Sequence, residues 1–163
     1  MNYLRESDNT CHRLADIQAR LFKEASKEGL PSLSFIRSFL CLSEVRKMDD
    51  LSFLYGNLSE QEVYALAKSH LNKQSGGTLF SQNEMHWIGY IYRTIAYMSG
   101  IPSRSLARLI APKYLQEVYP LYHSLDAKQA VEKIFFDLNI EIPDDGLRLK
   151  TIIRQSYQQE NRM

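Results

Sequence analysis

The sequence contains little cysteine, and its two cysteines lie far apart. Cys11 and Cys41 form no CxxC pair and no zinc-type Cys/His spacing. The histidines, His12, His70, His86 and His123, show neither HxxxH nor HExxH spacing. We therefore expect two reduced thiols, no disulfide and no metal site.

An excess of charge of one sign and long apolar runs are also missing. The chain carries 20 Lys+Arg against 19 Asp+Glu, a net charge of +1. Proteins held mainly by phosphate contacts usually have a clear basic excess, so any contact with nucleic acid must be local. No uncharged run approaches the ~20 apolar residues of a membrane span, and residues 1–10 have no apolar signal-peptide core. We expect a cytoplasmic protein without membrane contact.

Apolar residues recur at helical spacing along most of the chain. The length of 163 residues favours one domain, because domains average about 100–200 residues. We predict a single helical domain over 1–163, with 1–10 and 156–163 as candidates for disorder. The first helix covers about 8–28 and is closed by Gly29 and Pro31. Residues 32–55 read as one interrupted helix or two short ones.

Two capping boxes mark the start of further helices, Ser59 with Glu62 and Ser81 with Glu84. In the second helix, between 85 and 98, only His86, Arg93 and Thr94 are strongly polar. A helix that is apolar nearly all round is surrounded by its neighbours. The predicted fold class is therefore all-α, an irregular multi-helix bundle around this central helix.

The rest of the chain predicts three more helices and an ambiguous tail. A short helix runs from about 103 to 111, the next begins at Pro112, and Asp126 caps another. Residues 138–150 alternate around a turn at 143–146, which indicates a small β-hairpin, while 147–159 also fits an amphipathic helix. Both interpretations remain open.

The segment 92–111 matches a helix-turn-helix pattern. Ala96 and Gly100 have the spacing of the small residue and the turn glycine in that motif. The second helix would present its polar side chains outward, where arginine forks suit guanine edges or phosphate. The candidate DNA-binding residues are Ser103, Arg104 and Arg108. Two core helices that meet at a glycine turn would give the same pattern.

Aromatic residues gather between His86 and His123. Core packing explains most of them, but exposed tyrosines near an arginine are typical of protein interfaces. The candidate protein-binding residues are Trp87, Tyr90, Arg93, Tyr97, Tyr119 and Tyr122.

Signals of catalysis are weak. The sequence has no GxSxG elbow and no phosphate-binding glycine loop, and its paired carboxylates stand where helix caps and turns explain them. We expect no enzymatic activity, no catalytic residue and no cofactor. An enzyme would need a concave site that joins His86 or His123 to a carboxylate.

Two stretches resemble a known family. They are FIRSFLCLSEVRKMDD at 35–50 and a longer one at 85–134 that begins MHWIGYIYRTIAYMSG. They resemble small, poorly characterised proteins of Gram-positive gut and oral bacteria that are associated with toxin-antitoxin gene pairs. Relatives often have a tyrosine- and tryptophan-rich run after the arginine, where this chain has 94–96, Thr-Ile-Ala. The resemblance implies an antitoxin that covers a toxin's active surface, and many such proteins also repress their own operon through a helix-turn-helix.

The function that we expect is a non-enzymatic protein-binding module whose partner is a toxin. The alternative is a helix-turn-helix regulator that binds operator DNA. The sequence assigns no oligomeric state.

Overall fold

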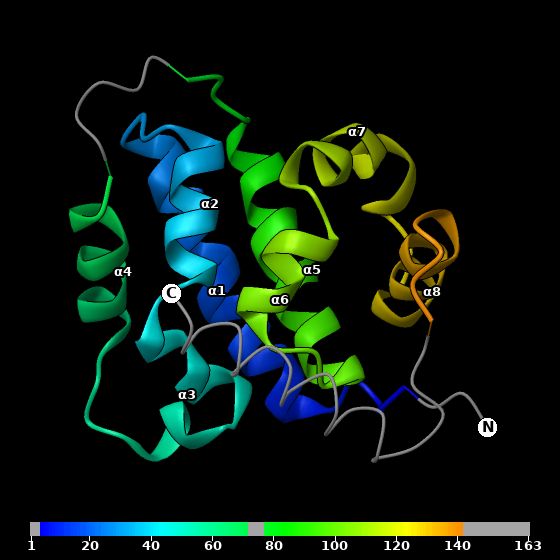
Figure 1. Ribbon diagram of the computed structural model, residues 1–163, viewed down its shortest axis with the longest axis horizontal. Coiled ribbons are helices and arrows are strands. Elements are labelled where there is room, and N and C mark those ends of the chain that lie inside the picture. Colours follow the sequence, from blue (N-terminus) through cyan, green and yellow to red (C-terminus); the bar gives the residue numbers. More distant parts are fainter. Residues whose placement is uncertain (1–3, 72–76, 142–163) are drawn as a thin grey trace.

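The computed structural model describes residues 4–71 and 77–141, and within these ranges every regular element is a helix (Figure 1). The elements are α1 (Asn9–Lys27), α2 (Ser32–Leu40), the 3₁₀ turn η1 (Ser43–Val45), α3 (Arg46–Asp49), the 3₁₀ turn η2 (Ser52–Tyr55), α4 (Glu60–Ser69), α5 (Gln82–Ser99), α6 (Ser103–Leu109), α7 (Pro112–Tyr122) and α8 (Ala127–Asp137). The predicted all-α class is confirmed, and of the two interpretations of residues 32–55 the structure has two short α-helices, α2 and α3, with two 3₁₀ turns.

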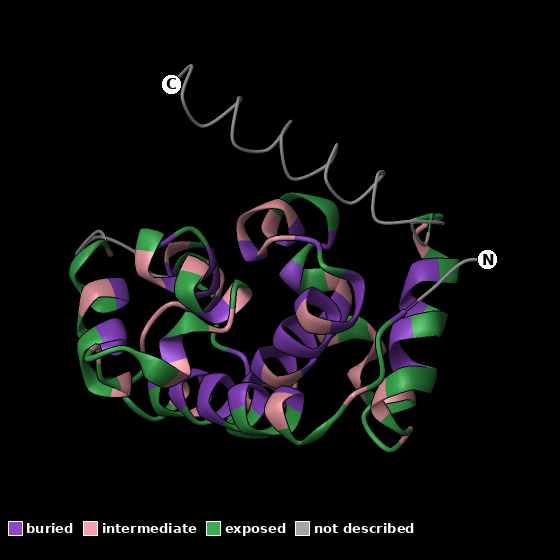
Figure 2. Ribbon diagram, turned by 90° about the horizontal axis from the view of Figure 1, so that it is seen from below, coloured by how far each residue is buried: buried purple, intermediate pink, exposed green. Residues whose placement is uncertain are grey.

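Helix α5 is the central element, as its composition predicts. It lies between α1, α2 and α4 on one side and α7 and α8 on the other (Figure 1). Its apolar positions, Met85, Ile88, Ile91, Tyr92, Ile95 and Met98, are at most 2% exposed. Buried residues gather on the sides of the helices that face one another (Figure 2). The core is therefore built around α5.

A close approach of two helices explains Gly89 in the middle of α5. A Cβ atom at this position would lie 2.8 Å from Cγ of Phe22 and 2.9 Å from the carbonyl oxygen of Gln18, both on α1. Glycine costs a helix about 1 kcal/mol relative to alanine. Here it allows α1 and α5 to make the most extensive helix-helix contact among the described residues.

Local sequence signals set the ends of most helices. Both capping boxes form, at Ser59 and at Ser81, and the Asp126 side chain accepts a hydrogen bond from the Gln129 amide. Gly100 ends α5 at φ +75°, in the left-handed region that favours glycine. Helix α6 ends at Leu109, two residues earlier than predicted, because Ile110 is extended.

The ends of the described chain bear on two expectations. Residues 4–10 were candidates for disorder, but Leu4 is buried and the Arg5 amide donates to the carbonyl oxygen of Met98 at 2.8 Å. Residues 138–141 form no strand and follow α8 through Asn139, whose φ is +53°. The remainder of the hairpin or helix expected at 138–159, and the segment 156–163, lie outside the described residues.

Candidate functional site

One side of α5 carries partly exposed aromatic rings. Between Met85 and Ser99, every residue is buried except His86, Trp87, Tyr90 and Tyr97. At about 100° of rotation per residue, these four fall within an arc of about 100° around the helix. We call Trp87, Tyr90 and Tyr97 the aromatic stripe. Three of the predicted protein-binding residues thus share one side of the central helix.

Residues near the N-terminus, just before α1 and in its first turn, contact two rings of the aromatic stripe. The Tyr97 hydroxyl donates to Oδ2 of Asp8 at 2.7 Å, and the Arg5 guanidinium lies 5.6 Å from the centre of the Tyr97 ring. The Tyr90 hydroxyl lies 2.6 Å from Nδ1 of His12. Burial, followed by the hydrogen bond to Asp8, raises the pKa of Tyr97 to about 12. Both phenols therefore remain neutral at pH 7.

Helix α7 holds the third ring. Trp87 meets Tyr119 edge to face at 5.8 Å between ring centres, and Tyr119 stacks on His123 at 4.4 Å. Nδ1 of His123 lies 2.7 Å from the Tyr119 carbonyl oxygen, which fixes the imidazole in place. Tyr119 is partly exposed. It therefore extends the aromatic surface from α5 onto α7.

Tyr122 takes part in a different contact. Its hydroxyl and that of Tyr114 donate to Oδ2 of Asp137, at 2.6 and 2.8 Å. These two hydrogen bonds hold the pKa of Asp137 below its ordinary value, and the bond from Tyr122 has the larger effect. Tyr122 was predicted to contact a partner, and in the structure its hydroxyl joins α7 to α8.

Arg93 requires a correction, because it is buried and does not reach the surface. It is 1% exposed, and its three donor groups are occupied. Nε donates to Oε1 of Gln18 at 3.0 Å, Nη1 to Oδ1 of Asp49 at 2.6 Å, and Nη2 to Oγ of Ser103 at 2.8 Å. Arg93 therefore ties α5 to α1, α3 and α6 and cannot contact a partner.

The segment 92–111 makes the left-handed turn predicted at Gly100, but one of its three candidate DNA-binding side chains is buried. Ser103, expected to face outward, is 1% exposed. Its amide and hydroxyl donate to the two carboxylate oxygens of Asp49, at 3.1 and 2.6 Å. Asp49 thus occupies the amino end of α6, where a phosphate would otherwise be attracted. Of the other candidates, Arg108 is exposed and Arg104 is half-buried.

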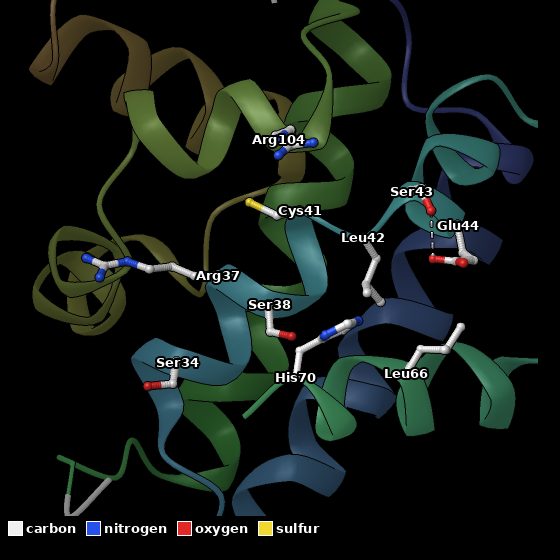
Figure 3. Close-up of a pocket in the computed structure, with 10 residues that line it drawn as sticks. All are labelled: Ser34, Arg37, Ser38, Cys41, Leu42, Ser43, Glu44, Leu66, His70 and Arg104. Carbon is white, nitrogen blue, oxygen red and sulfur yellow. Dashed lines mark hydrogen bonds between the residues drawn. The ribbon is translucent and has the colours of Figure 1, made fainter. Parts of the chain in front are cut away.

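A groove that the sequence did not predict runs along α2. It has a volume of about 600 Å³ between α2, the end of α4 and the start of α6 (Figure 3). Ser34, Arg37, Ser38 and Cys41 are spaced i, i+3, i+4 and i+7, so they share one face of α2. The other lining residues are Leu42, Ser43, Glu44, Leu66, His70 and Arg104.

Metal and membrane sites find no support in the described part of the chain. Residues 4–71 and 77–141 contain no group of three His, Cys, Asp or Glu side chains that could hold a metal ion. None of the helices in these ranges combines the length and the apolarity that crossing a bilayer requires.

Comparison with known proteins gives no match: no family model, curated protein or solved structure is similar to this chain.

Proposed function

We propose that the chain is a non-enzymatic protein-binding module that binds its partner through the aromatic stripe and Tyr119. The observation that carries this proposal is that these rings are partly exposed on α5 and the adjoining α7. The other residues of α5 from Met85 onward, His86 excepted, are buried. Tryptophan and tyrosine are the residues most enriched among those that dominate binding energy.

Intramolecular contacts order the aromatic rings in the absence of a partner. Each makes an intramolecular contact: Tyr97 with Asp8, Tyr90 with His12, and Trp87 with Tyr119. Ordering a side chain at an interface costs about 0.5–1.5 kcal/mol, and a side chain that is already ordered avoids most of this cost. The geometry therefore favours binding by a preformed surface.

The partner that we propose is a toxin encoded beside this chain. The resemblance of 35–50 and 85–134 to antitoxin-like proteins supports this choice. An antitoxin of the protein type acts by covering the toxin's active surface and needs no chemistry of its own. A preformed aromatic surface on a helical body is suited to that role.

Growth rescue tests the proposal. The neighbouring gene should arrest growth when it is expressed alone, and co-expression of this chain should restore growth. We expect the double variant Trp87→Ala/Tyr119→Ala to fail to restore growth while it remains folded by circular dichroism.

Tyr55 provides the matched control, because it is 89% exposed and lies on η2 rather than on α5. Tyr55→Ala should rescue growth as well as the wild type does. A harmless neighbouring gene product, or equal rescue by the double variant, would contradict the proposal.

DNA binding has weaker support. The left-handed turn at Gly100 fits a helix-turn-helix, but Ser103 is buried and the Asp49 carboxylate lies where α6 would receive a phosphate. Direct readout would depend on Arg104 and Arg108 within a chain of net charge +1. Protein binding is therefore the function that the geometry supports best.

A further inference from the structure

Arg5 lies at one end of the aromatic stripe. It is exposed, and its guanidinium carbon lies 5.6 Å from the centre of the Tyr97 ring. Trp87, at the other end of the stripe, is about 15 Å from Tyr97 along α5, at 1.5 Å per residue. We expected an arginine beside the exposed tyrosines and assigned this role to Arg93, which is buried. In the structure, Arg5 is the arginine beside this surface.

The backbone around Arg5 is held in place although it belongs to no helix. The Arg5 amide donates to the Met98 carbonyl oxygen at 2.8 Å, and the preceding side chain, Leu4, is buried. Asp8 accepts from the Cys11 amide at 3.0 Å and so caps α1. Contacts on both sides of Arg5 therefore limit the entropy that its backbone loses when a partner binds.

The Arg5 guanidinium has no ion-pair partner in the part of the chain that the structure describes. The Asp8 carboxylate is engaged elsewhere, because it accepts from the Cys11 amide and the Tyr97 hydroxyl. These two hydrogen bonds lower the pKa of Asp8 more than the charge of Arg5 does. No acceptor among the described residues therefore occupies the N–H groups of this guanidinium.

The charges near Arg5 favour a single carboxylate over a nucleic-acid backbone as its partner. Glu6 and Asp8 are acidic and exposed, and Oε1 of Glu6 lies 4.0 Å from Nζ of Lys128 on α8. Two carboxylates so close in sequence disfavour a row of phosphates. One carboxylate can still form two parallel hydrogen bonds with a guanidinium that stacks on an aromatic ring.

We propose that Arg5 belongs to the partner surface and binds a carboxylate of the partner protein. This carboxylate is that of an aspartate or glutamate next to the apolar residues that cover the aromatic stripe. The inference rests on the proposed function, because it takes the partner to be the product of the neighbouring gene. Arginine is, with tryptophan and tyrosine, among the residues most enriched at positions that dominate binding energy.

Isothermal titration calorimetry of the full chain with the purified product of the neighbouring gene tests the role of Arg5. We expect Arg5→Gln to weaken binding about fivefold, the effect of one partly exposed ion pair, and Arg5→Glu to weaken it further. Both losses should shrink at high salt, which screens exposed charges. Lys47→Glu makes the same change of charge at an exposed position on α3 and should bind as the wild type does. Equal affinities of Arg5→Glu and Lys47→Glu would overturn the proposal.

A double-mutant cycle separates a direct contact of Arg5 from a structural role. Each Asp or Glu of the partner is replaced by Asn or Gln and titrated against the wild-type chain and against Arg5→Gln. One of these partner substitutions should weaken binding to the wild-type chain about fivefold and leave binding to Arg5→Gln unchanged. If Arg5 only ordered the backbone near it, every partner substitution would act equally on both chains, and the proposal would be overturned.

The same titrations distinguish failure of this inference from failure of the proposed function. If the wild-type chain binds and Trp87→Ala/Tyr119→Ala does not, unchanged binding by Arg5→Glu overturns the role of Arg5 alone. If the wild-type chain does not bind the neighbouring gene product, the proposed function fails and this inference fails with it.

Discussion

Arg93 is a charged side chain inside the central helix α5, most of whose residues are buried. Its burial is tolerated because each donor group has an acceptor and because Asp49 supplies the opposite charge at 2.6 Å. The Asp49 carboxylate also accepts hydrogen bonds from the amide and the hydroxyl of Ser103. One carboxylate on α3 therefore contacts both α5, through Arg93, and α6. The pair therefore fixes the positions of α3 and α6 against α5.

Removing Arg93 should leave Asp49 without its countercharge. We expect Arg93→Ala to lower the free energy of unfolding by about 3 kcal/mol, the usual cost of breaking a buried pair on one side. Urea denaturation followed by circular dichroism measures this loss. Arg13→Ala, at an exposed position, should change stability by less than about 0.5 kcal/mol. Equal effects of the two substitutions would show that the buried network contributes little.

Gly89 is the second residue on which the α1–α5 contact depends. Overpacking costs about 1–3 kcal/mol, while alanine gains about 1 kcal/mol in helix propensity. We expect Gly89→Ala to lose about 1 kcal/mol net, because the new Cβ would meet Phe22 at 2.8 Å. Thermal unfolding measures the change. Gly56→Ala, whose Cβ would find only ordinary contacts, serves as control, and a stabilised Gly89→Ala would refute the close approach.

At the scale of elements, α7 and α8 are joined by hydrogen bonds from two tyrosines to one carboxylate. Tyr114 and Tyr122 donate to Asp137 from α7, and both hydrogen bonds are stronger when the carboxylate is ionised. The lowered pKa of Asp137 follows from these bonds. The docking of α8 is therefore sensitive to acid.

The contribution of Asp137 to stability should depend on pH. Because its folded pKa lies below the ordinary 3.8, the contribution is complete well above pH 3.8 and is lost as the pH falls through the folded value. At pH 7 we expect Asp137→Asn to be less stable than the wild type by up to about 1 kcal/mol. The difference should vanish in acid, as measured by denaturation at several pH values. A difference that grows in acid would contradict this assignment.

Most element boundaries follow from local chemistry and could be predicted. Ser59, Ser81 and Asp126 cap the helices that they were expected to cap, and Gly100 makes the expected left-handed turn. A break near Asp49 or Asp50 could be expected, but the left-handed conformation of Leu51, with φ +69°, could not, because neither glycine nor asparagine stands at that position. Positions fixed by tertiary contacts leave no such signal.

The candidate site could be predicted only in part, for a similar reason. Helical periodicity places Trp87, Tyr90 and Tyr97 on one side of a helix, but it does not show whether that side faces the core or the solvent. Arg93 and Ser103 were assigned to surfaces because their common partner, Asp49, is 44 and 54 residues away in sequence. A lone arginine within an apolar helix indicates burial, and this signal could have corrected the assignment of Arg93 to a surface.

At the scale of the whole molecule, two surfaces of different chemistry lie on one helical body. The aromatic stripe and Tyr119 suit a protein partner, whereas the groove along α2 is lined by serine, arginine, histidine and glutamate side chains together with Cys41, Leu42 and Leu66. A body without strands among residues 4–71 and 77–141 offers no sheet edge there for a partner to extend.

The central claim is that the aromatic surface on α5 and α7 is where another protein binds. Site-specific photo-cross-linking in the native host tests it, with benzoylphenylalanine placed at position 87, 119 or 55 in separate strains. The account predicts the same discrete protein adduct at positions 87 and 119, identified by mass spectrometry, and none at 55. Adducts that are absent at 87 and 119, or that are the same at all three positions, would contradict it.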